Sequence, residues 1–69
     1  MRIKAEDFTS MRGHVANGCE VVTPSGKVYT LRNRMNGWMF YDENKTAISG
    51  YLPSAHDVEY FVFNALSQS

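Results

Sequence analysis

The stretch VYTLRNRMNGWMFY, residues 28–41, decides the predicted fold. Its β-branched and aromatic residues favour strands, and Asn36-Gly37 separates them with a strong two-residue signal for a β-hairpin. Both residues of this pair tolerate the left-handed backbone angles of a type I′ turn, so we expect one strand on each side. With a two-residue loop at this point, Arg32 lies opposite Tyr41.

Two further turns extend this hairpin in both directions. Pro-Ser-Gly at 24–26 combines a residue that presets a turn angle with one that accepts a positive φ, and it predicts a strand near 19–23. Glu-Asn-Lys-Thr at 43–46 predicts a turn into a last strand, AISGYL. We therefore predict a four-stranded antiparallel β-meander over residues 19–52.

Residues 54–67 change to a helical period. Ser54 is a good helix N-cap, and Asp57 three residues later makes a carboxylate variant of the capping box. The apolar residues recur on one helical stripe: Val58, Phe61, Val62, Ala65 and Leu66. The pattern predicts a C-terminal helix that packs on the sheet.

The first 18 residues are an N-terminal arm with a weaker pattern. Ile3, Phe8, Met11 and Val15 lie at roughly helical spacing, and Gly13 can end a short helix. We expect a short helix or an irregular arm here. Together the segments predict one α+β domain over residues 1–69, with the meander, a C-terminal α-helix packed on one face, and the arm.

Side-chain alternation along the strands assigns two faces to the predicted sheet. The face expected under the helix carries Val22, Tyr29, Leu31, Met35, Trp38, Phe40, Ala47 and Tyr51. The opposite face carries Val21, Val28, Thr30, Arg32, Arg34, Met39, Tyr41, Ile48 and Leu52. The first face is free of formal charge, so its aromatic residues are expected to form the core.

The opposite face supplies the first candidate binding residues, Arg32, Arg34 and Tyr41. Arginine and tyrosine are enriched where proteins bind one another, so the three predict a partner-binding surface. One alternative is that the N-terminal arm covers this face and the arginines are only solvated. Another is that the face binds nucleic acid, since some RNA-binding sheets use such side chains.

The outer side of the predicted helix supplies the second candidate set. His56, Tyr60 and Phe63 follow the spacing i, i+4, i+7. A helix with aromatic residues on both sides indicates contact with a second chain, either another protein or a copy of this one in a homodimer. The alternative is that Tyr60 packs at the sheet rim and Phe63 is a single exposed apolar residue.

Composition excludes several functions. Seven basic and seven acidic residues cancel, so net charge gives no support to non-specific nucleic-acid binding. Cys19 is the single cysteine, which excludes an internal disulfide, and with His14 and His56 it lacks the spacing of a zinc site. No activated nucleophile or phosphate-binding loop is recognisable. We expect no enzyme, no catalytic residue, no metal and no cofactor.

These observations lead to one functional hypothesis and its alternatives. We expect a small cytoplasmic domain with no signal peptide and no membrane span, which binds another protein. By analogy of size it is expected to be an inhibitor or adaptor of the phage or mobile-element type acting on a host protein. The alternatives are a nucleic-acid-binding accessory protein that uses the Arg/Tyr face, and a domain that only self-associates.

Overall fold

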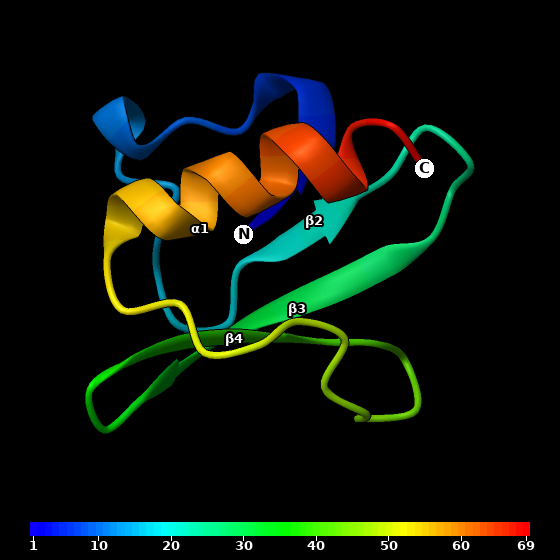
Figure 1. Ribbon diagram of the computed structural model, residues 1–69. Helices are drawn as coiled ribbons and strands as arrows, with labels where there is room; N and C mark the ends of the chain where they lie inside the picture. The colour runs from blue at the N-terminus through cyan, green and yellow to red at the C-terminus, as the bar shows by residue number, and fades with distance from the viewer.

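The computed structural model describes residues 1–69 and has an α+β fold, as predicted (Figure 1). A four-stranded sheet has the order β1-β2-β3-β4, and the C-terminal helix lies over one side of it. The strands are β1 Arg2–Lys4, β2 Glu20–Val22, β3 Val28–Arg34 and β4 Gly37–Tyr41.

The predicted antiparallel meander is correct for its first three strands, but it omits the first strand of the sheet and its last strand does not form. The sheet begins in the N-terminal arm, where β1 pairs parallel to β2 with Ile3 beside Val21. A parallel pair requires a long crossover connection, and the rest of the arm supplies it. The sheet is therefore mixed, and only β2, β3 and β4 follow one another antiparallel.

The segment expected as the last strand, residues 47–52, makes only two isolated bridges, Tyr41 with Ala47 and Trp38 with Leu52. Between the bridges, the Phe40 N–H donates to Ser49 Oγ at 3.0 Å. A side-chain oxygen thus takes the place of a backbone carbonyl and interrupts the ladder. Leu52 packs against the core, which corrects its assignment to the opposite face.

The turn between β3 and β4 differs from the predicted type I′ hairpin. Arg34 pairs with Gly37, so Met35 and Asn36 form the loop, and neither has a positive φ. Gly37 is required for another reason: a Cβ there would lie 2.5 Å from the Leu52 carbonyl oxygen. The close crossing of this segment, and not the turn angle, explains the glycine.

This turn shifts the predicted register by two residues. Arg32 lies opposite Met39, and Tyr41 lies opposite Thr30. Because the shift is even, the faces of β3 and β4 are as predicted, and Leu31 and Phe40 are fully buried. The β2 assignment is reversed: Val21 pairs with Tyr29 and points into the core.

The C-terminal helix begins as predicted. The Asp57 N–H donates to Ser54 Oγ at 3.2 Å, which caps α1, Ala55–Phe61. The helix continues as a wider π-helical turn, η3, Val62–Leu66. Its buried stripe is Val58, Val62 and Leu66, and Phe61 stacks on Phe40 with ring centroids 5.4 Å apart. No helical segment has the length and apolarity needed to cross a membrane.

The N-terminal arm packs on the helix side of the sheet (blue in Figure 1). After β1 it forms two 3-10 turns, η1 Ala5–Asp7 and η2 Ser10–Arg12, and Gly13 ends the second with a φ of +73°. Ala5 and Phe8 are buried in the same core as the helix. The alternative in which the arm covers the opposite sheet face is therefore wrong, and that face stays open.

Candidate functional site

The first candidate surface, here the outer sheet surface, comprises Arg32, Arg34 and Tyr41 on the side of the sheet away from the helix. Arg34 donates to Tyr41 Oη from Nε at 2.9 Å and from Nη2 at 2.5 Å. Its guanidinium carbon lies 5.2 Å from the centre of the Tyr41 ring. Strand alternation thus places the three residues together, and two of them are directly paired.

Met39 contacts the tyrosine of this pair. Met39 and Tyr41 are on the same face of β4, and the Tyr41 hydroxyl donates to Met39 Sδ at 3.9 Å. Met39 and Tyr41 are half-buried, while Arg32 and Arg34 are exposed. The guanidinium group of Arg34 therefore rests on the Tyr41 side chain, held by two hydrogen bonds to its hydroxyl.

A shallow hollow of about 530 Å³ extends from this pair along the sheet. It is lined by Glu20, Val28, Thr30, Arg32, Arg34, Tyr41, Asp42, Glu43 and Lys45. Three cationic and three anionic side chains are among these residues. Such a surface is complementary to a mixed-charge protein surface, whereas the carboxylates repel the phosphates of a nucleic acid.

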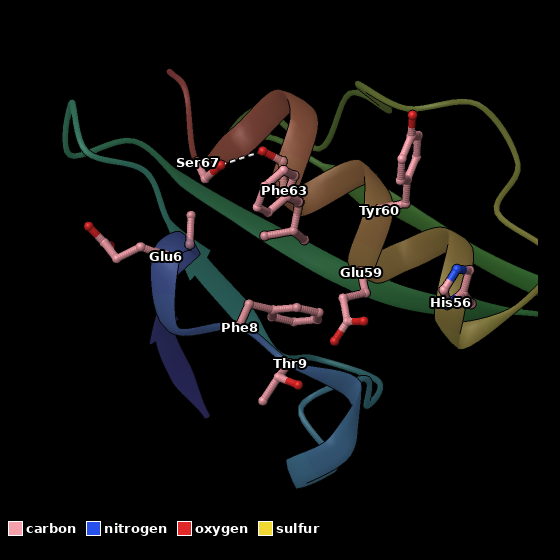
Figure 2. Close-up of a pocket in the computed structure, with 10 residues that line it drawn as sticks. Glu6, Phe8, Thr9, His56, Glu59, Tyr60, Phe63 and Ser67 are labelled. Carbon is pink, nitrogen blue, oxygen red and sulfur yellow. Dashed lines mark hydrogen bonds between the residues drawn. The ribbon is translucent and has the colours of Figure 1, made fainter.

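The second candidate surface is a hollow of about 370 Å³ between the N-terminal arm and the helix, here the arm–helix groove. It is lined by Ala5, Glu6, Phe8, Thr9, His56, Glu59, Tyr60, Val62, Phe63 and Ser67. All three predicted helix residues are in this set. Figure 2 shows Phe8 and Thr9 on the arm at one side of the helix, and Tyr60 pointing away from the helix on the other side.

Buried and exposed apolar residues meet in this groove. Phe8 and Val62 belong to the core, whereas Tyr60 and Phe63 are 68% and 69% exposed. The expectation that Tyr60 packs against the sheet rim is therefore wrong, and Phe63 is not a single exposed apolar residue. Two largely exposed aromatic side chains thus line the same hollow, a feature found at interaction sites.

A hydrogen bond joins the arm to the helix. The Ser10 N–H donates to Glu59 Oε2 at 2.6 Å. This bond, with help from the hydroxyl of Thr9, lowers the pKa of Glu59 below its ordinary value. On the arm itself, the Thr9 N–H donates to His14 Nδ1 at 3.0 Å. Figure 2 shows Glu59 reaching toward Thr9.

Two features of the reactive side chains bear on chemistry, the state of the one thiol and the grouping of possible metal ligands. Cys19 is 1% exposed, and burial raises the pKa of its thiol, which disfavours the nucleophilic thiolate. No group of three or more His, Cys, Asp or Glu residues is placed to hold a metal ion.

Comparison with known proteins adds no further constraint. No family model, no curated protein and no solved structure matches this chain.

Sequence reasoning missed the contribution of the arm to the second surface. Phe8 and Glu6 line the groove only because the arm packs on the helix. This contact joins residues that are 49 positions apart, Ser10 and Glu59. Glu59 shows no distinguishing local pattern, since a glutamate on a helix is usually a solvated residue. No signal in the sequence could have identified this contact.

Proposed function

We propose that this chain is a small non-enzymatic protein-binding domain, with the outer sheet surface as a contact site. The observation that carries the proposal is the uncovered sheet face on which Arg34 and Tyr41 are already paired. Arginine and tyrosine supply a large share of the binding energy at protein interfaces. A surface that contributes so little to the core is free to be specialised for a partner.

Nucleic-acid binding is the second candidate, and it rests on the same residues. Tyr41 offers a ring for stacking, and Arg32 and Arg34 offer charge. The mixed charge of the hollow favours a protein, because Glu20, Asp42 and Glu43 lie beside the arginines. A protein partner with both acidic and basic groups satisfies all of these residues at once.

The proposed mode of action is that of an inhibitor or adaptor. A domain of 69 residues acts on a host protein most simply by occupying its surface, as small proteins of phages and mobile elements do. The single cysteine, buried and free, is compatible with a reducing compartment, so we propose a cytoplasmic location.

The experiment that tests the proposal is quantitative affinity capture with four proteins. Wild type is compared with Arg34→Ala, Tyr41→Ala and the control Arg12→Ala, which removes an exposed arginine from η2 on the opposite side. We expect one protein to be enriched by wild type and the control, with affinity reduced by more than about 1 kcal/mol in at least one sheet variant. Equal binding by all four proteins would remove the outer sheet surface as the site.

An electrophoretic shift assay separates the two candidate functions. A nucleic-acid complex has to weaken steeply as salt rises, because bound phosphates release counterions. We expect no shift with single- or double-stranded DNA or RNA at either low or high salt. A shift at low salt that is lost in Arg32→Ala and Arg34→Ala would establish the nucleic-acid function instead.

A further inference from the structure

We propose that the arm–helix groove binds a basic amphipathic helix presented by a partner protein. The groove lies on the helix side of the sheet, so this inference does not depend on the outer sheet surface. It rests on the length and shape of the groove, on its exposed aromatic residues and on its charge.

The groove has the form of a stripe along the helix. His56, Tyr60, Phe63 and Ser67 follow one another on successive turns, and all four line it. At about 1.5 Å per residue this stripe is about 16 Å long, which matches roughly three turns of a second helix. Two helices pack through ridges of this spacing, and such grooves bind helices whose apolar anchors recur every three or four residues.

The π-helical turn contains Phe63, the main aromatic contact residue of the proposed groove. The Ser67 N–H donates to the Val62 carbonyl at 2.8 Å, one residue beyond an α-helical bond, and the Ser67 hydroxyl donates to the Phe63 carbonyl. Within this turn Val62 is 1% exposed, whereas Phe63 is 69% exposed. Single π turns inside helices frequently occur at functional sites.

The charge of the groove selects the partner. Two carboxylates line it, those of Glu6 and Glu59, and no lysine or arginine does. The hydrogen bond from Ser10 lowers the pKa of Glu59, so this carboxylate is ionised at neutral pH. An apolar stripe bordered by negative charge is complementary to a helix with apolar anchors flanked by lysine or arginine, and it disfavours an acidic one.

The arm gives the groove a defined second wall. Phe8 is 8% exposed and fixed in the core, and Glu59 holds the neighbouring Ser10 backbone at 2.6 Å. The groove is thus formed before binding, and a partner helix does not have to order the arm. A preformed groove of this kind loses little conformational entropy when it is filled.

The test uses two synthetic helical peptides of about 14 residues, long enough to span the stripe. One has leucine anchors with lysine flanks, and the other has the same anchors with glutamate flanks. Binding to the full chain is followed by NMR shifts of Tyr60 and Phe63 and by titration. We expect the lysine peptide to bind at least about tenfold more tightly than the glutamate peptide.

Variants locate the binding. Phe63→Ser and Tyr60→Ser are each expected to weaken the lysine peptide about tenfold or more, and both remain folded because these side chains are exposed. Glu6→Gln is expected to weaken it severalfold and to reduce the salt dependence, whereas Glu43→Gln, on the outer sheet surface, leaves both unchanged.

Four results would overturn the proposal. One is equal affinity for the two peptides, and another is a set of NMR shifts confined to the outer sheet surface. The third is a homodimer in sedimentation equilibrium that Phe63→Ser converts to monomers, since a second copy would then occupy the groove. The fourth is the absence of binding by either peptide. If Arg34→Ala still abolishes protein capture in that case, the proposed function stands and only this inference is rejected.

Discussion

The two sides of the β3–β4 hairpin are built from alternating residues of the same strands, yet they differ in what covers them. On one side Leu31 and Phe40 are fully buried beneath the helix and the N-terminal arm. On the other side Arg32 and Arg34 are exposed and nothing is packed over them. The difference teaches that the covered side maintains the fold, while the open side can change with little cost in stability.

The largest expected effect comes from the covered side. Phe40→Ala removes a fully buried ring that stacks on Phe61, and it is expected to reduce the free energy of unfolding by about 3–5 kcal/mol. Phe61→Ala and Trp38→Ala act in the same direction with smaller effects, since both residues are partly exposed. Denaturant unfolding measures the losses.

The matched control for Phe40→Ala is Tyr41→Ala, the next residue on the opposite side. It is expected to cost less than about 1 kcal/mol, because Tyr41 contacts surface residues and not the core. Equal losses for the two variants would contradict the distinction between the sides.

The next largest effect tests the crossing beside β4. Gly37→Ala places a Cβ within 2.5 Å of the Leu52 carbonyl oxygen and 2.7 Å of the Tyr51 ring, so the segment leading to the helix has to move. We expect a loss of about 1–3 kcal/mol, as for other overpacked sites. Gly50→Ala is the control, because its Cβ meets nothing within 4 Å. A thermal melt in which both variants match wild type would show that the crossing is not tight.

A pH-dependent effect tests how the arm covers the inner side. The pKa of Glu59 is lower in the folded chain because the Ser10 N–H donates to it. Its contribution to stability is therefore complete above the ordinary glutamate pKa of about 4.3 and is lost as the pH falls through the lower folded value. We expect the melting temperature of wild type to fall more on acidification than that of Glu59→Gln.

Glu43→Gln serves as the control for this measurement, since Glu43 is exposed on the outer sheet surface. It is expected to follow the wild-type pH profile. If Glu59→Gln follows the same profile as wild type, the hydrogen bond to Ser10 does not hold the arm.

The smallest effect on stability belongs to the open side. Arg34→Ala removes two exposed hydrogen bonds to Tyr41 and is expected to change the free energy of unfolding by at most about 0.5 kcal/mol. Arg12→Ala provides the reference for loss of an exposed arginine. A loss above about 2 kcal/mol in Arg34→Ala alone would show that this arginine stabilises the fold. The open side of the sheet would then contribute to stability as the covered side does.

Local chemistry explains which parts of the fold were predictable. Ser54 caps the helix, Gly26 takes the positive φ of its turn, and alternation assigns Leu31 and Phe40 to the core; each depends on residues close in the sequence. The pairing of β1 with β2 joins residues far apart over only three positions, with no local pattern to reveal it. The role of Gly37 was misread because its constraint comes from Leu52.

The candidate surfaces divide in the same way. Alternation predicts that Arg32, Arg34 and Tyr41 share a face, and helical spacing predicts that Tyr60 and Phe63 share a stripe. Both placements follow from a single element or a single hairpin. The groove needs Phe8 from the arm as well, and no periodic signal connects that residue to the helix.

The hydrogen bond between Ser10 and Glu59 also has a consequence for the order of folding. The two residues are 49 positions apart, so the arm has no docking site until the helix has been synthesised. At a translation rate of about 5–20 residues per second, this leaves the arm without its partner for roughly 2 to 10 s. During that interval Phe8 has no helix to pack against. The nascent chain therefore exposes this apolar side chain until the helix forms.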